Sequence, residues 1–187
     1  MQSPTDSEIL QFVSESNHIE GEPDQPGHPL FDDYVTICKY VINSRFPSQV
    51  RPLDIHKVLL RSQPWKFPGE IRQCGVSVGG SNKMNPELAR VIYPLHIKEV
   101  DDRLLVDKYA LPAQHVTDEE SWDFHYAFET IHPFIDGNGR TGRLWLNAIR
   151  IQCGLPWITV MYNDRYQYYD AISEWEHLNG RTKWKLG

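Results

Sequence analysis

Residues 132–143 of the chain read HPFIDGNGRTGR and lie between two segments in which apolar residues recur at helical spacing. The first segment opens with a capping box formed by Thr117 and Glu120. It ends at Pro133, because the residue before a proline disfavours the α conformation. Helical periodicity returns over residues 144–152. The sequence therefore predicts two strong helices joined by a glycine-rich loop.

This loop has the composition of an anion-binding site. Gly137, Asn138 and Gly139 lead into the second helix, where free backbone N–H groups and the positive end of the helix dipole attract phosphate. Arg140 and Arg143 are three residues apart, so they share one face of that helix and can bind phosphate oxygens with their planar guanidinium groups.

The loop also carries groups suited to phosphate chemistry. Asp136 supplies a carboxylate, a hard oxygen ligand for Mg²⁺ beside a phosphate. His132 follows the first helix and titrates in the range expected of a general base. Each residue alone is more often structural, but the combination predicts a catalytic site that acts on a phosphate compound. The residues alone do not distinguish phosphoryl transfer from nucleotidyl transfer.

The rest of the chain is predicted to be mainly helical, with one exception. Helical spacing of apolar residues predicts further helices over residues 9–19, 31–43 and 53–61 and from Asn85 onward. In residues 67–80, glycines interrupt the chain and Ile71, Val76 and Val78 alternate with polar or small residues. This pattern predicts a short, exposed β-hairpin.

Length and composition limit the class of protein. The 187 residues correspond to one domain, at roughly 150 residues per domain. With 40% hydrophobic and 12% aromatic residues, the chain can bury a sizeable core, which excludes a disordered protein. A net charge of −6 argues against non-specific binding to nucleic acid or an anionic membrane. No apolar run reaches the roughly 18 residues of a membrane-spanning helix.

Two further patterns concern the compartment. The N-terminus lacks the basic and apolar regions of a signal peptide. Cys38, Cys74 and Cys153 are odd in number and form no CxxC pair, so we expect free thiols rather than disulfides or a zinc site. Together these features predict a cytoplasmic protein.

The segment 132–143 resembles in full the signature of the Fic (filamentation induced by cAMP) family, HPFx[D/E]GNGRxxR. His125 and Phe128 precede it at the spacing usual in that family. Residues 68–79 resemble the family's target-docking flap, and residues 164–169 its nucleotide-pocket segment. The resemblance implies a mainly α helical bundle with one β-hairpin flap, with residues 30–187 as the catalytic domain.

The resemblance also implies an activity: transfer of AMP from ATP to a Ser, Thr or Tyr hydroxyl of a target protein, with release of pyrophosphate. His132 would deprotonate the hydroxyl, and Asp136 would hold Mg²⁺ on the α- and β-phosphates. His125 is expected to cap or pack rather than to catalyse. The residues expected to bind the nucleotide are Asp136, Gly137, Asn138, Gly139, Arg140, Thr141, Gly142 and Arg143 in the motif, Val76, Ser77, Val78 and Gly79 in the flap, and Tyr168 and Tyr169.

The partner implied by the resemblance is a target protein docked on the flap near residues 71–79, with the chain itself as one candidate target. Free backbone groups at the hairpin edge would take up a target segment as an added strand. The alternative for Val76 and Val78 is an ordinary buried hairpin face.

Residues 16–21, SNHIEG, resemble the family's inhibitory motif [S/T]xxxE[G/N]. Ser16 and Glu20 are four residues apart and share one helix face, and Gly21 follows. The resemblance implies that Glu20 pairs with Arg143 and keeps it from the γ-phosphate, so residues 1–22 would form an inhibitory helix packed on the core. Ordinary polarity at a helix end is the alternative.

Two departures from the family pattern leave other functions open. Glu176 stands seven residues after Tyr169, where several members place an asparagine that contacts adenine. Residues 179–187 also lack the apolar last helix expected from the family. The alternatives are transfer of another phosphate-linked group, removal of AMP from a target, and a non-catalytic binding or toxin–antitoxin module.

Overall fold

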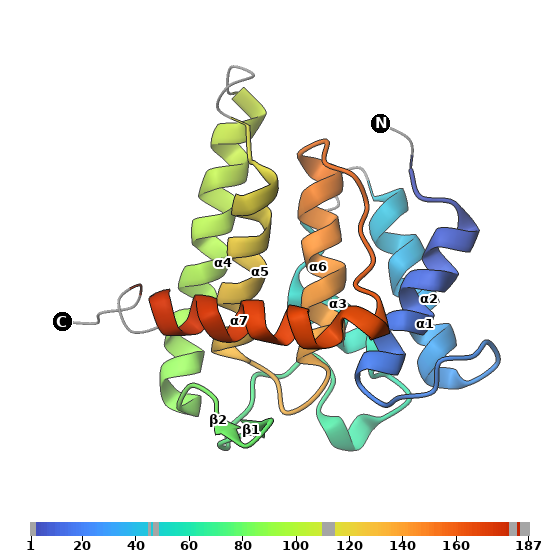
Figure 1. The fold of residues 1–187 in the computed structure, drawn as a ribbon, viewed down its shortest axis with the longest axis horizontal. Coiled ribbons are helices and arrows are strands. Elements are labelled where there is room, and N and C mark those ends of the chain that lie inside the picture. Colours follow the sequence, from blue (N-terminus) through green and yellow to red (C-terminus); the bar gives the residue numbers. More distant parts are fainter. Residues whose placement is uncertain (1–2, 45, 47–48, 110–114, 180–182, 184–187) are drawn as a thin grey trace.

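The computed structural model describes residues 3–44, 46, 49–109, 115–179 and 183, and most of these residues are helical (Figure 1). The α-helices are α1 (Asp6–Ile19), α2 (Pro29–Asn43), α3 (Pro52–Leu59), α4 (Pro86–Tyr109), α5 (Asp118–Ile131), α6 (Asn138–Gln152) and α7 (Arg165–Asn179). Short 3₁₀ turns η2 (Pro64–Lys66) and η4 (Tyr162–Asp164) and two strands, β1 (Ser77–Val78) and β2 (Ser81–Asn82), complete them. The predicted mainly α fold is confirmed, and the hairpin predicted over residues 67–80 is shorter and later, with its two described strands between Ser77 and Asn82.

The helix starts follow from local sequence signals. Thr5 caps α1 in a capping box with Glu8, and Thr117 caps α5 in the same way with Glu120. Pro86 stands in the first turn of α4, as predicted. The helix predicted over residues 53–61 is shorter, because the chain leaves the α conformation at Leu60.

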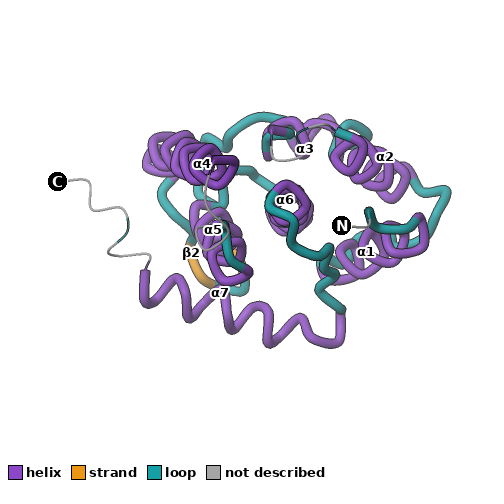
Figure 2. Tube along the Cα trace, turned by 90° about the horizontal axis from the view of Figure 1, so that it is seen from above, coloured by secondary structure: helices purple, strands orange, loops and turns teal. Residues whose placement is uncertain are grey.

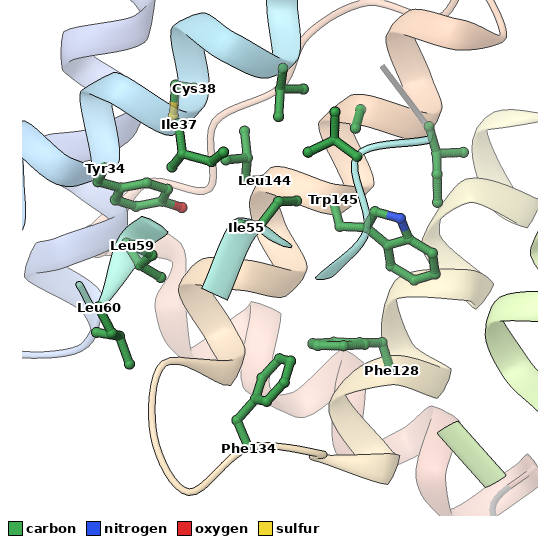
Figure 3. Close-up of a cluster of buried hydrophobic side chains, with 14 of the residues drawn as sticks. Tyr34, Ile37, Cys38, Ile55, Leu59, Leu60, Phe128, Phe134, Leu144 and Trp145 are labelled. Carbon is green, nitrogen blue, oxygen red and sulfur yellow. The ribbon is translucent and has the colours of Figure 1, made fainter. Parts of the chain in front are cut away.

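Helix α6 lies at the centre of the molecule. Figure 2 shows it between α1, α2 and α3 on one side and α4 and α5 on the other, with α7 crossing below. Nearly every side chain of its first three turns is buried, so the helix packs on all sides. Figure 3 shows Leu144 and Trp145 of α6 among the core side chains, with Phe134 of the preceding loop beside Phe128 of α5. The core therefore fixes the segment 132–143 from both ends.

The hairpin is small and projects from the helices (Figure 1). Ser77 pairs with Asn82 and Val78 with Ser81, in antiparallel register. Gly79 and Gly80 form the turn with φ angles of 57° and 82°, which glycine adopts without steric cost. The side chain of Val78 is 44% exposed, so the alternative of a buried hairpin face does not hold for this residue.

Helix α7 was not predicted as a helix from sequence. It carries Tyr168, Ile172 and Trp175 as its buried residues, at helical spacing. The expected lack of an apolar last helix in residues 179–187 falls largely outside the described residues. Among the described residues, none of the helices combines the length and apolar character needed to cross a bilayer. Cys38 and Cys74 are free thiols.

Candidate active site

The turn between α5 and α6 is held by its own side chains. His132 caps α5 in the left-handed region, at φ 50°, and its N–H donates to the carbonyl of Phe128. The Asn138 side chain closes the loop, because its Oδ1 accepts from Phe134 N–H and its Nδ2 donates to Phe134 O, each at 2.9 Å. Gly137 precedes α6 at φ 74°. Asn138 therefore shapes the loop with its side chain and leaves only its backbone for an anion.

Arg72 joins the base of the flap to this loop. Its buried guanidinium donates to the carbonyls of His132, Cys74 and Met84, and its N–H donates to Pro133 O at 2.9 Å. Sequence reasoning missed this residue, because an arginine among glycines carries no local signal for such a role.

His132 is held as a neutral imidazole. Its Nδ1 lies 3.3 Å from the carbonyl of Glu129, and because a carbonyl only accepts, Nδ1 carries the proton and Nε2 has the free lone pair. Burial, with the nearby Lys83 cation, lowers the pKa of His132 to about 4. Burial also raises the pKa of Glu129, one turn away, to about 7. At neutral pH the histidine is thus in the form required of a general base.

Arg143 is bound by Ser16 and Glu20 of the segment 16–21. Its Nη2 donates to Glu20 Oε1 at 2.7 Å and to Ser16 O at 3.0 Å, and its Nε donates to Ser16 Oγ at 2.8 Å. The Arg143 side chain is 2% exposed. The predicted pairing of Glu20 with Arg143 is present in the structure, and the direct bonds from Ser16 add to it. Gly21, at φ 67°, then turns the chain away from α1.

Two glycines of the motif make room for carboxylates. A Cβ on Gly139 would lie 2.2 Å from Glu20 Oε1, and a Cβ on Gly142 would lie 2.3 Å from Glu129 Oε1. Gly139 therefore permits the close approach of Glu20 to the start of α6. Gly142 and the buried Thr141 serve packing beneath the motif.

Asp136 and Arg140 lie in a second group of charges. Arg140 is fully buried, and its Nη2 lies 3.2 Å from Glu22 Oε1 and 3.8 Å from Asp136 Oδ1. Lys66 contacts both Glu22 and Asp136. Burial raises the pKa of Asp136, but the hydrogen bond from Lys66 and the charge of Arg140 outweigh it, and the pKa stays below its ordinary value. Glu22 and Lys66 were not predicted, because neither belongs to a sequence pattern.

Asp136 fits a magnesium ion in chemistry and exposure. Its carboxylate is a hard oxygen ligand with 40% of the side chain exposed. In the described part of the chain, no group of three or more His, Cys, Asp or Glu side chains is placed to hold a metal ion. Mg²⁺ would therefore need further ligands from phosphate oxygens and water.

A cavity of about 950 Å³ opens beside His132. It joins parts of the chain that are far apart in sequence: Glu20, Gly139 and Arg143 near the start of α6, the flap residues Val78 and Gly79, and Tyr168, Tyr169 and Glu176 of α7. Eight residues of the predicted nucleotide-binding set do not line this cavity: Val76, Ser77, Asp136, Gly137, Asn138, Arg140, Thr141 and Gly142.

The two tyrosines of α7 differ in their surroundings. Tyr168 is buried and its hydroxyl lies 2.8 Å from His125 Nε2, so His125 packs within the core as predicted. Tyr169 is 38% exposed. Glu176 pairs with Lys83 at 3.0 Å at the wall of the cavity. The departure at Glu176 thus replaces an amide with a neutralised ion pair.

Comparisons with known proteins point to one family. A family model described as "Fic/DOC family" matches residues 50–149. The protein adenylyltransferase Fic of Drosophila grimshawi is 49% identical over 124 residues, which cover 64% of this chain and 23% of that protein. Protein adenylyltransferase fic-1 of Caenorhabditis elegans is 32% identical over 120 residues, 64% of this chain and 22% of that protein. The chain thus spans less than a quarter of the length of these curated relatives.

Solved structures show the same fold. A Fic domain-containing signalling protein from Bacteroides thetaiotaomicron superposes with a TM-score of 0.72 at 21% identity, over 90% of this chain and 71% of that one. Residues 134–508 of Fic-1 from Caenorhabditis elegans give a TM-score of 0.65 at 23% identity, over 90% of this chain and 55% of that one.

Proposed function

Because the chain belongs to the Fic/DOC family, we propose that it transfers AMP from ATP to a Ser, Thr or Tyr hydroxyl of a protein. We further propose that Glu20 restrains this reaction by holding Arg143. The observation that carries the proposal is the placement of a neutral His132 in one cavity with the start of α6 and Arg143. The cavity volume of about 950 Å³ is ample for a nucleoside triphosphate.

His132 acts as the general base. Its Nε2 takes the proton of the target hydroxyl, and the hydroxyl oxygen forms a bond to the α-phosphorus. The bond from that phosphorus to the α,β-bridging oxygen breaks, and pyrophosphate leaves. The proton remains on His132 and passes to solvent after the product departs. The low pKa of His132, about 4, keeps the lone pair available at neutral pH.

The start of α6 binds the phosphates. Backbone N–H groups near Gly139 face an anion without an intervening side chain, and the helix dipole adds to their attraction. Mg²⁺, held at Asp136, supplies charge stabilisation to the phosphates when bound. Arg143 stabilises negative charge on the leaving pyrophosphate once Glu20 has released it.

The restraint is electrostatic. Arg143 is 2% exposed and donates to Glu20 and Ser16, so a phosphate must replace a carboxylate already bound to it. Breaking a buried ion pair by removing one partner leaves the other charge in need of a counter-ion. Removal of Glu20 therefore makes Arg143 a stronger phosphate site.

The flap is proposed to dock the target. The hairpin has only two strands, and Val78 at its tip is 44% exposed. A target segment can add to its free edge as a further strand and place its hydroxyl near His132. The chain itself is a further candidate target, beside the proteins of the cell lysate used below.

The experiment supplies Glu20→Gly protein with Mg²⁺ and ATP labelled at either the α- or the γ-phosphate, with a cell lysate as source of targets. We expect label on protein from the α position only, and its loss in Glu20→Gly, His132→Ala. Label from the γ position would show phosphorylation instead. Protein label from neither position, with folded protein that binds ATP, would contradict the proposal.

A further inference from the structure

Glu20 and Glu22 lie two residues apart, and each contacts a different arginine of the motif. Glu20 Oε1 accepts from Arg143 Nη2 at 2.7 Å, and Glu22 Oε1 accepts from Arg140 Nη2 at 3.2 Å. The first contact is the one on which the proposed inhibition rests. The second adds an acid that lies outside the segment 16–21.

Lys66 connects this second acid to Asp136. Its Nζ lies 3.0 Å from Glu22 Oε1 and also contacts Asp136 Oδ2. Arg140 Nη2 lies 3.8 Å from the other Asp136 oxygen. Two cations and two carboxylates thus form one neutral group. In this group Asp136, the carboxylate suited to a divalent cation, already contacts the ammonium group of Lys66.

The fold holds Lys66 in this position. Gly69 N–H donates to His56 Nδ1 at 2.8 Å, so the proton of this ring is on Nε2, which donates to Asp136 O at 2.9 Å. His56 therefore ties the segment that follows Lys66 to the backbone of Asp136 itself.

Arg140 has unused donors beside this group. The Arg140 side chain is fully buried. Its Nε and Nη1 have no hydrogen-bond partner among the described residues. Such buried donors are costly unless an anion meets them. Among the described residues, Glu22 is the carboxylate within hydrogen-bond distance of Arg140, through Nη2, and Asp136 lies farther from the same nitrogen, at 3.8 Å.

We propose that Lys66 competes with the divalent cation for Asp136, and that Glu22 is a second inhibitory acid that holds Lys66 and Arg140 in this closed arrangement. An ammonium group and a divalent cation repel each other strongly at one carboxylate, so metal binding requires Lys66 to leave. When Lys66 leaves, Glu22 still occupies Arg140, so a phosphate must displace Glu22 to reach this guanidinium group. The inference rests on the proposed function only in taking Asp136 as the metal carboxylate.

The first test measures binding of Mn²⁺ by electron paramagnetic resonance, in the presence of α,β-methylene ATP. Lys66→Met is expected to bind Mn²⁺ tighter than the unchanged protein by about fivefold or more, the usual size of coupling between two sites. Lys66→Arg keeps the charge and should bind Mn²⁺ as the unchanged protein does. Lys39→Met removes an exposed charge that pairs with Asp6 and serves as the matched control.

Unchanged or weaker Mn²⁺ binding by folded Lys66→Met, with the fold checked by circular dichroism, would overturn the role of Lys66. If Lys66→Arg bound Mn²⁺ as tightly as Lys66→Met, the role of Lys66 would also be overturned. The proposed competition for Asp136 depends on the positive charge, which arginine keeps.

The second test measures binding of metal-free α,β-methylene ATP by calorimetry in EDTA. Glu22→Gln frees Arg140 for phosphate and is expected to bind the analogue several-fold tighter. Asp24→Asn removes one negative charge from the same loop, where Asp24 faces His18, and should change affinity much less. Equal gains in the two variants would show a general charge effect and overturn the role of Glu22.

Both tests read binding rather than transfer, so they separate this inference from the proposed function. Loss of AMP transfer in Glu20→Gly would refute the function and leave the Mn²⁺ result interpretable. Transfer of AMP by Glu20→Gly, with no effect of Lys66→Met on Mn²⁺, would refute this inference alone.

Discussion

His132 combines two properties that follow from its place at the end of α5. Its carbonyl partner fixes the tautomer with a free Nε2, and burial lowers its pKa to about 4. The motif sequence predicted a base at this position, but a free histidine titrates near 6.5, and only the surrounding core accounts for the shift. The sequence predicts which group acts as the base, and the packing determines over what pH range it is unprotonated.

The pH dependence of transfer tests this. In Glu20→Gly, the free-base form of His132 should persist down to acid pH, because its lowered pKa favours the unprotonated ring. Rates of α-label incorporation between pH 8 and pH 5.5 should therefore lack a fall centred near pH 6.5. A fall with that midpoint, with the fold intact by circular dichroism, would show an unshifted histidine.

At the level of helices, α1 is joined to α6 both by apolar packing and by the Glu20–Arg143 pair. Phe12 and Val13 of α1 are almost completely buried in the core, so the helix does not depend on the ion pair for its docking. A Cβ at Gly139 would meet Glu20 Oε1 at 2.2 Å, so this glycine makes room for the Glu20 carboxylate beside Arg143. The end of α1 and the start of α6 thus fit each other at a single glycine.

A double-mutant cycle tests this fit. Gly139→Ala should cost about 1–3 kcal/mol of unfolding free energy, the range for overpacking in a core. In a Glu20→Gly background the clashing carboxylate is gone, so the same change should cost less than half as much. Urea unfolding of the four proteins gives both values. Equal costs in the two backgrounds would place the strain elsewhere, for example at Arg143.

The elements themselves were predictable to different degrees. Capping boxes at Thr5 and Thr117 are local patterns, and the predicted helix starting near Thr117 was confirmed. The contacts of Lys66 with Glu22 and Asp136 join three separate segments and have no local pattern. The pairing of Glu20 with Arg143 is equally long-range, and it was predicted only because both residues belong to motifs of a known family.

Across the whole molecule, the central position of α6 places many polar groups out of water. Burial lowers the pKa of His125 to about 3 and that of His56 and His132 to about 4, so the folded state holds all three rings neutral. Glu129 shows the opposite shift, to about 7. Keeping these groups in their shifted protonation states therefore costs folding free energy, by an amount that depends on pH.

Stability should fall as pH decreases from 6.5 to 4.5. In this range the unfolded chain binds protons at the three histidines that the folded chain excludes, so acid favours unfolding. Glu129 has the opposite effect on stability, because it binds a proton in the folded state that it releases in the unfolded state. Its contribution offsets that of about one of the three histidines. We expect a net loss of at least about 2 kcal/mol by denaturant unfolding. Equal stability at both pH values would contradict the burial of these rings.

The central claim is that His132 and the start of α6 form an AMP-transfer site that Glu20 keeps restrained. The most direct measurement compares incorporation of label from α-labelled ATP into protein by the unchanged chain and by Glu20→Gly, side by side. We expect a low rate for the unchanged chain and a rate at least about tenfold higher for Glu20→Gly, equivalent to about 1.4 kcal/mol. The rate should fall to background when His132→Ala is added. Equal rates with and without Glu20, or transfer that survives the loss of His132, would contradict it.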